Sequence, residues 1–264
     1  MSFGGNSGYD TYSIVPRDGG KAVKHARVTT VAGTLDSTEG LTKWKMRMVA
    51  IGLAARPDLM ALVAVTNPSQ KWVLNRACDD AKEAAAASSS ANTGTALHTL
   101  TERIDAGEKM VVPPMFRKDL AAYQRAIKKF GVTIDPHFIE RVCVCGSLDE
   151  PVAGTIDRIA TWRRKKIITD LKTGQSLDFG WWKIAIQLAI YAHADSLYDR
   201  ETEEHETMPA VDQERAIVFH LPAGKGVCTP YLVDLVAGWQ AAQQAVAVRQ
   251  WRKRKNLSEL MEAA

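Results

Sequence analysis

Segments rich in apolar residues recur along the chain, and their length and composition predict which of them form strands and which form helices. Residues 152–162 and 166–172 are rich in Ile, Val, Thr and Trp, residue types that favour β-strands. A short basic run, which suits a solvent-exposed turn, connects them: Arg163, Arg164, Lys165 and Lys166. The pattern therefore predicts an antiparallel hairpin in the middle of the chain.

Other apolar segments predict helices before and after this hairpin. In residues 115–130, Leu120, Tyr123 and Ile127 recur at helical spacing, and Gly131 stops the pattern. Further helices are predicted over residues 44–55, 70–87, 94–106 (capped by Thr93), 177–198 and 236–252. Strands are predicted over residues 132–145, 214–221 and 226–235. Together these elements predict an α/β fold with a mixed central sheet flanked by helices.

Composition divides the chain into three parts. The first 26 residues are polar and rich in glycine, which predicts a flexible arm. Residues 27–252 are expected to form one large domain or a domain with an extension, since 264 residues with 46% hydrophobic content can bury a substantial core. Residues 253–264 are expected to be a basic and polar tail.

The hairpin carries the candidate chemistry. Side chains alternate between the two faces of a strand, so Asp170 and Lys172 point the same way. If Arg164 and Lys165 form a two-residue loop, Asp157 lies opposite Lys172, and any even-length loop keeps all three side chains on one face. An odd-length loop would separate them.

These residue types suit hydrolysis of phosphodiesters. Two carboxylates and a nearby backbone carbonyl, here that of Leu171, offer hard oxygen ligands to Mg²⁺ or Mn²⁺. Such a metal ion acidifies a bound water and polarises a phosphate, and Lys172 would stabilise developing charge. By itself, however, an Asp-x-Lys triplet on a strand is more often a solvated edge.

Several motifs together resemble the PD-(D/E)XK nuclease superfamily, and within it the RecB-like branch that includes phage-type exonucleases. They are Gly154-x-x-Asp157, Asp170-x-Lys172-Thr-Gly and Gln187-x-x-x-Tyr191, preceded by Gly94-Thr-Ala-Leu-His98. The resemblance spans residues 28–251 and implies a restriction-endonuclease-like core.

The resemblance also implies roles for individual residues. His98, Asp157, Asp170 and the Leu171 carbonyl would bind the metal, and Lys172 would be the catalytic lysine. Gln187 and Tyr191 would border the site and touch DNA, and Glu140 would be an additional acidic residue. Two of these have simpler alternatives, because His98 could be a packed core histidine and Tyr191 a core aromatic.

Charge and cysteine spacing refine this expectation. The net charge of +4 permits nucleic-acid binding without requiring it. The hairpin-tip run and a second basic cluster with Trp251 and Arg252 could hold phosphates, with Trp251 stacking on a base; alternatively they are a solvated tip and tail. The four cysteines (Cys78, Cys143, Cys145 and Cys228) have spacing that suits neither an iron–sulfur cluster nor a zinc site, so no cluster is expected.

The resulting hypothesis is an Mg²⁺- or Mn²⁺-dependent DNA exonuclease of recombination or repair. An endonuclease or a flap- or branch-selective nuclease remains an alternative, as does a catalytically silent DNA-binding subunit. No Walker loop or Gly-x-Ser-x-Gly elbow occurs in the sequence, so a helicase would be a separate chain. A single-strand annealing or recombination protein is the other expected partner, and a homo-oligomer is compatible with the sequence. With no signal peptide or membrane-spanning run predicted, the expected location is cytoplasmic, in the host cell if a phage encodes the protein.

Overall fold

The computed structural model describes residues 11–85, 89–255 and 257–258. It divides into two compact units, Met1–Asp36 with Thr101–Ala264, and Ser37–Leu100. We call them the sheet unit and the helical unit. Within the domain expected over residues 27–252, residues 37–100 thus pack mainly among themselves.

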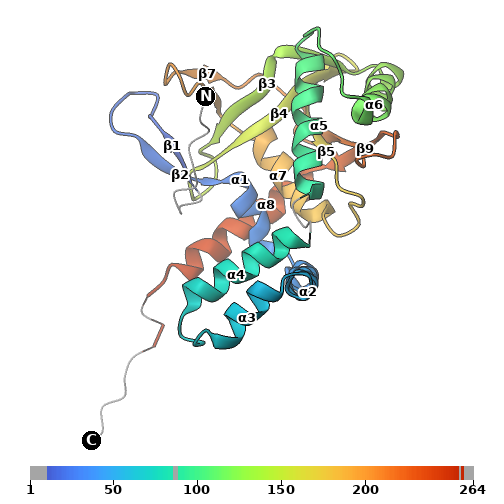
Figure 1. The fold of residues 1–264 in the computed structure, drawn as a ribbon. Coiled ribbons are helices and arrows are strands. Elements are labelled where there is room, and N and C mark those ends of the chain that lie inside the picture. The colour runs from blue at the N-terminus through green and yellow to red at the C-terminus, as the bar shows by residue number, and fades with distance from the viewer. Residues whose placement is uncertain (1–10, 86–88, 256, 259–264) are drawn as a thin grey trace, which may run out of the picture. The chain divides into compact units, whose positions relative to one another are not determined.

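A mixed sheet of nine strands is the centre of the sheet unit (Figure 1). Seven strands follow the order β7-β6-β3-β4-β5-β8-β9, while β2 pairs with β1 and with β4. The β5–β8 and β2–β4 pairs are parallel and the others are antiparallel. The predicted α/β fold with a mixed central sheet is thus confirmed. The strands are β1 (Thr11–Ile14), β2 (Val23–Arg27), β3 (Thr133–Cys145), β4 (Val152–Trp162), β5 (Lys165–Lys172), β6 (Ser196–Tyr198), β7 (His205–Thr207), β8 (Arg215–His220) and β9 (Thr229–Asp234).

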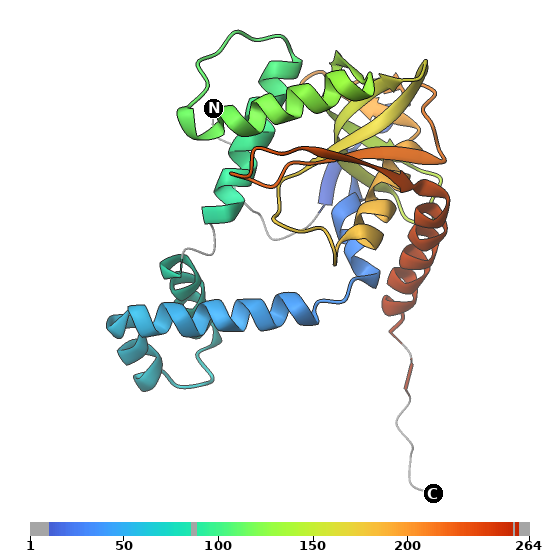
Figure 2. The same ribbon diagram turned by 90° about the vertical axis from the view of Figure 1, so that its right-hand side faces the viewer.

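Helices cover both faces of this sheet. On one face, α1 (Val28–Ala32), α7 (Trp181–Ala192) and α8 (Leu235–Arg252) share a buried core with apolar residues of β4, β5 and β8. On the other face, Tyr123 of α6 (Arg117–Phe130) meets Phe219 of β8 edge to face, with 5.8 Å between ring centroids. Figure 2 shows α6 lying along the strands. The short turn η1 (Gly33–Leu35) follows α1, and η2 (Pro114–Phe116) precedes α6.

The N-terminal segment is more ordered than its composition predicts. Strands β1 and β2 pair with each other, and Ile14 is buried against Val142, Val144 and other residues of the sheet. The Tyr12 hydroxyl lies 3.0 Å from Thr155 Oγ1. The predicted flexible arm is therefore wrong for residues 11–26, because a few apolar side chains suffice to seat the hairpin. Residues 1–10 lie outside the described residues.

The central hairpin forms one residue earlier than expected. Trp162 pairs with Lys165, so the loop consists of Arg163 and Arg164, whose φ angles are 49° and 67°. Positive φ at both loop residues is typical of the tight turn whose twist matches that of the strands. The loop keeps an even length, but its shift places Asp157 opposite Asp170 rather than Lys172.

Several other boundaries differ from the sequence-based expectation. The helix predicted over residues 177–198 is shorter, since α7 ends at Ala192 and residues Ser196–Tyr198 form β6. Thr93 lies inside α5 (Ser89–Asp105) rather than capping it. The tail is expected from residue 253 on. Lys253 Nζ lies 3.0 Å from Glu150 Oε1, so this first residue of the expected tail is held to the sheet unit. Residues 256 and 259–264 lie outside the described part.

The helical unit contains α2 (Glu39–Ala55), α3 (Pro57–Val65), α4 (Lys71–Ala84) and the start of α5. Helix α3 was not predicted from the sequence. Gly52 of α2 lies so close to α4 that an added Cβ would overlap the Ala81 carbonyl oxygen. Within the described residues no single helix could cross a membrane by length and hydropathy; α2 and α3 meet that test only as a pair bent by 107°.

Candidate active site

Asp157, Asp170 and Lys172 converge on the two central strands of the sheet. The Lys172 ammonium lies 3.0 Å from Asp170 Oδ1 and 2.8 Å from Oδ2. Asp157 Oδ2 accepts a hydrogen bond of 2.9 Å from the Leu171 amide, which lies between Asp170 and Lys172. The register that pairs Arg158 with Thr169 brings Asp157 opposite Asp170. The convergence expected from the even-length loop is therefore present.

Burial makes this group electrostatically unusual. Asp170 is only 2% exposed, and burial, assisted by the Asp157 carboxylate, raises the pKa of Asp170 to about 6 despite the opposing effect of Lys172. Burial alone would lower the pKa of Lys172, but the Asp170 and Asp157 carboxylates outweigh it and raise this pKa. Lys172 is therefore a cation at neutral pH and cannot act as a base.

Glu140 joins the same group from β3. The pairs Ile139–Arg158 and Arg141–Ile156 flank it, so it lies opposite Asp157. Its φ of 52° is rare for a residue with a side chain, and such backbone outliers cluster at functional sites. Burial and the carboxylates of Asp157 and Glu102 raise the pKa of Glu140 to about 8, although part of the side chain reaches solvent. The expected additional acidic residue thus belongs to the carboxylate group.

Two residues of the site were missed by the sequence reasoning. Glu102 on α5 interacts electrostatically with Asp157, and burial raises the pKa of Glu102. Arg158 is 1% exposed, and its Nη1 lies 4.0 Å from Asp157 Oδ2. The available signals were the position of Glu102 one helical turn after His98, and the position of Arg158 directly after Asp157.

Gln187 and Tyr191 lie one turn apart on α7, as predicted, and Gln187 Nε2 donates a hydrogen bond of 3.1 Å to the Tyr191 hydroxyl. Tyr191 is only 2% exposed, and burial raises its pKa well above the usual value. Tyr191 therefore packs as a core aromatic, which is the simpler of the two alternatives stated above. Gln187 is partly exposed, and its contact with DNA stays a prediction.

Gly154 explains why α7 can approach the strand so closely. A Cβ at this position would lie 2.8 Å from Tyr191 Cε1 and 2.9 Å from Val28 Cγ2. We expect Gly154→Ala to lower the free energy of unfolding by about 1–3 kcal/mol, because the added methyl group overpacks this contact. Urea denaturation measures the change. Gly174→Ala is the control, since its Cβ would meet nothing closer than 3.6 Å; equal losses in both variants would contradict the close-packing explanation.

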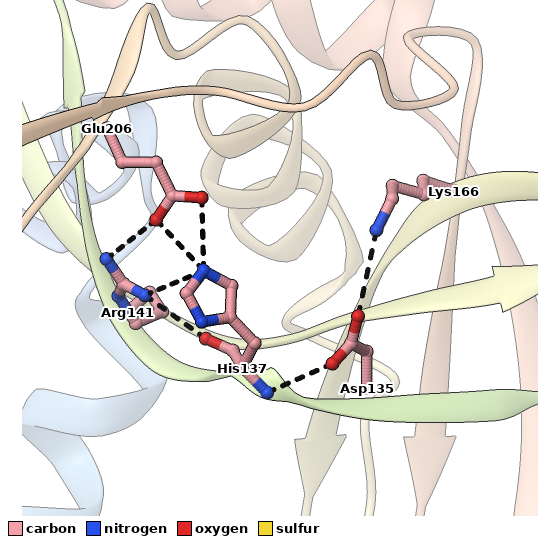
Figure 3. Close-up of polar contacts among 5 residues, drawn as sticks. All are labelled: Asp135, His137, Arg141, Lys166 and Glu206. Carbon is pink, nitrogen blue, oxygen red and sulfur yellow. Dashed lines mark hydrogen bonds and ion pairs between the residues drawn. The ribbon is translucent and has the colours of Figure 1, made fainter.

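The remaining predicted residues are distributed over other parts of the molecule. His98 lies on α5 within the helical unit, and its metal role stays a prediction. Arg163, Arg164 and Lys165 are exposed at the hairpin tip. The Lys166 ammonium, in contrast, lies 4.0 Å from Asp135 Oδ2 (Figure 3). It also lies 4.0 Å from the Phe138 ring centroid.

The C-terminal basic cluster is partly neutralised. Trp251 is 56% exposed and Arg252 is exposed. Arg249, however, forms two hydrogen bonds with the Glu150 carboxylate, of 2.8 and 3.0 Å. Arg252 and Trp251 thus remain accessible for the contacts with DNA that the sequence predicts.

The four cysteines are free thiols. Cys143 and Cys145 are buried on β3. Burial raises the pKa of both thiols, and it raises the pKa of Cys228 to about 12. Protonated thiols are poor metal ligands, so the carboxylate group is the better candidate for a metal site.

The carboxylate group has the donor chemistry of a magnesium or manganese site. Asp170 Oδ2 is buried and accepts no hydrogen bond of good geometry, although the Lys172 ammonium is close. In the part of the chain that the structure describes, no three His, Cys, Asp or Glu side chains are arranged to hold a metal ion. Mg²⁺ usually takes only one or two protein carboxylates and keeps several waters. Asp157 and Asp170 are therefore enough carboxylates for such an ion, and the Leu171 carbonyl stays a predicted third ligand.

The pKa of Glu140 has a consequence for stability. The pKa of this carboxyl is higher in the folded chain than its ordinary 4.5, so the folded chain holds the proton more tightly than the unfolded chain does. The stability that Glu140 contributes is therefore fully present below pH 4.5 and is lost as the pH rises towards 8. In EDTA, Glu140→Gln should reduce the loss of stability between pH 5 and pH 8 by about 1 kcal/mol, allowing for solvent screening of this exposed side chain. Thermal unfolding across this range measures it, with Glu206→Gln on β7 as the control. Identical pH profiles for wild type and Glu140→Gln would contradict the expectation.

Comparison with known proteins adds little to this geometry. The chain matches no protein-family model and no curated protein. Among solved structures, it is similar to one titled "Crystal structure of SSO0001", with 16% sequence identity and a TM-score of 0.28. The match covers 49% of this chain and 57% of that one, so the chain spans little more than half the length of that protein. At this TM-score the likeness does not define a common fold.

Proposed function

We propose that this protein is an Mg²⁺- or Mn²⁺-dependent deoxyribonuclease of the PD-(D/E)XK type, acting as an exonuclease in recombination or repair. The observation that carries the proposal is the convergence of Asp157, Asp170 and Lys172 from two adjacent strands, with Lys172 Nζ within 3.0 Å of the Asp170 carboxylate. The motif resemblance supplies the substrate class, DNA.

In this proposal each residue has a distinct task. Asp157, Asp170 and the Leu171 carbonyl would hold the divalent ion. When bound, the ion lowers the pKa of a coordinated water and polarises the phosphate. Lys172, a cation held beside both carboxylates, stabilises the negative charge that develops on the phosphate. No nucleophilic side chain is needed, because water attacks directly.

The positive charge at the hairpin tip would assist DNA binding away from the reacting phosphate. Arg163 and Arg164 occupy the loop, and Asp170 lies six positions after Arg164. At about 3.3 Å per residue this corresponds to roughly 20 Å along the strand, which is several nucleotides from the site. Contacts there would add affinity that depends on salt concentration without reading the sequence.

The test is digestion of labelled DNA in Mg²⁺, Mn²⁺ and EDTA. We expect a linear duplex to be degraded only with the divalent ion and a covalently closed circle to survive. Cleavage of the circle would favour the endonuclease alternative, including a flap- or branch-selective enzyme. An absence of cleavage with either ion, together with retained DNA binding, would favour a silent DNA-binding subunit that acts with a recombination protein or a separate helicase.

A further inference from the structure

The guanidinium of Arg158 lies inside the protein, directly after Asp157 in the sequence. Arg158 is 1% exposed and is among the largest fully buried side chains of the described residues. Burying a charge removes its hydration and requires charged or hydrogen-bonding partners in compensation. The identity of those partners therefore indicates what the arginine holds in place.

The partners come from three different elements. Nε lies 2.5 Å from Asp105 Oδ2, and Nη2 donates a hydrogen bond of 2.8 Å to Thr101 Oγ1. Thr101 and Asp105 lie one turn apart on α5. Tyr123 of α6 donates a hydrogen bond of 2.7 Å to the same Asp105 carboxylate, and its ring centroid lies 5.7 Å from the guanidinium carbon. The third nitrogen, Nη1, lies 4.0 Å from Asp157 Oδ2.

This arrangement constrains both α5 and the candidate metal ligand. Two contacts one turn apart hold the end of α5 against β4 and restrict its rotation about its axis. Glu102 lies between those contacts and interacts electrostatically with Asp157 and Arg158. The planar guanidinium is suited to such a task, because it presents several donors in a fixed geometry that an ammonium cannot reproduce.

Stability alone does not account for an ion pair here. Replacing a buried ion pair by apolar residues of similar volume is often neutral or stabilising. Here, however, Nη1 of the paired Arg158 faces Asp157, a candidate metal ligand. In other metalloproteins, residues behind the ligands orient them in this way, and loss of such a residue reduces metal affinity or activity.

We propose that Arg158 is a positioning residue of the candidate active site: anchored by Asp105 and Thr101, it holds the Asp157 carboxylate and the end of α5 in their working arrangement. This inference rests on the proposed nuclease function and extends it to a residue that does not touch substrate.

The experiment compares wild type, Arg158→Lys and Thr101→Val. Arg141→Lys is the matched control, since Arg141 lies on the neighbouring strand in an exposed cluster with His137 and Glu206 (Figure 3). The measurements are kcat and KM for labelled linear DNA, the Mn²⁺ concentration for half-maximal rate, and Mn²⁺ affinity by calorimetry. All are made well below the melting temperature of each variant.

For Arg158→Lys we expect kcat to fall about tenfold or more and the Mn²⁺ requirement to rise about tenfold, with KM for DNA nearly unchanged. Thr101→Val should raise the Mn²⁺ requirement by about threefold, since the hydrogen bond from the guanidinium to Thr101 is lost, and Arg141→Lys should match wild type. A residue that served stability alone would leave the Mn²⁺ requirement of the folded variant unchanged. An unchanged Mn²⁺ requirement in Arg158→Lys would therefore overturn the proposal. If Arg158→Lys does not fold, an unchanged Mn²⁺ requirement in Thr101→Val would overturn it instead.

The design separates this inference from the proposed function. If wild type cuts DNA and the Arg158 and Thr101 variants behave like wild type, only the positioning role fails. If wild type cuts no DNA but binds Mn²⁺ more tightly than these two variants do, the nuclease function fails and the positioning of the metal ligand stands. If wild type neither cuts DNA nor binds Mn²⁺, both proposals fail.

Discussion

Asp170→Asn is expected to lower kcat for DNA cleavage by about a thousandfold and to weaken Mn²⁺ binding. The substitution keeps the size of the side chain but removes the negative charge that a divalent ion requires of its ligand. Asp170 is the most buried carboxylate of the group, at 2% exposure, so solvent cannot replace it. Gel assays of labelled DNA and calorimetric titration with Mn²⁺ measure the two effects.

Lys172→Met separates binding from chemistry in the same assays. The ammonium does not ligate the metal, so Mn²⁺ affinity should be retained while kcat falls about a hundredfold or more. Asp135→Asn is the control, because Asp135 is a carboxylate of β3 that accepts a hydrogen bond from the His137 amide and lies 4.0 Å from the Lys166 ammonium. Wild-type rates in both Asp170→Asn and Lys172→Met would show that the catalytic centre lies elsewhere.

The largest effect on stability is expected from Asp105→Asn, with a loss of about 3–5 kcal/mol in the free energy of unfolding. The side chains of Asp105 and Arg158 are 6% and 1% exposed. Removing the carboxylate leaves a buried guanidinium without its counter-charge, and the Tyr123 hydroxyl keeps a weaker acceptor. Urea denaturation should report the loss, and the melting temperature should fall by about 10 °C for a chain of this size.

Glu206→Gln is the matched control for that loss, since it breaks an ion pair with Arg141 on the surface, where the Glu206 side chain is 40% exposed. Its cost should be at most about 1 kcal/mol. A similar loss in the free energy of unfolding for both variants would contradict the view that burial makes the Asp105–Arg158 pair important for stability. The double variant Asp105→Leu with Arg158→Met should recover much of the stability without recovering the wild-type Mn²⁺ requirement, which would separate packing from positioning.

The central hairpin could be predicted because its determinants are local. Strand-favouring residues on both sides of a basic turn define β4 and β5, and the two-residue alternation of side chains relates Asp157 to Asp170 through the parity of the loop. The exact loop could not be predicted, because Arg163-Arg164 and Arg164-Lys165 have similar composition. Both candidate loops have two residues, so the wrong choice of loop changed only the residue that lies opposite Asp157, which is Asp170 instead of Lys172. The side chains of Asp157, Asp170 and Lys172 still share one face.

Tyr191 and the N-terminal hairpin show what local sequence patterns could not predict. Spacing correctly related Tyr191 to Gln187 on one helix, but its burial depends on Gly154, a residue on another element 37 positions earlier in the chain. Likewise, the polar composition of the first residues concealed β1, whose Ile14 is buried by residues of β3, β4 and β6.

Local sequence patterns thus defined the α/β character, the central hairpin and the convergence of two carboxylates and a lysine, since these depend on periodicity and on pairing between adjacent segments. The surroundings of that site depended on contacts between distant segments. Arg158 meets partners 53 and 57 residues earlier in the chain, and Glu140 and Glu102 reach the site from a separate strand and helix. Such contacts arise only when the elements pack, because burial and charge balance are properties of the assembled fold rather than of any one segment.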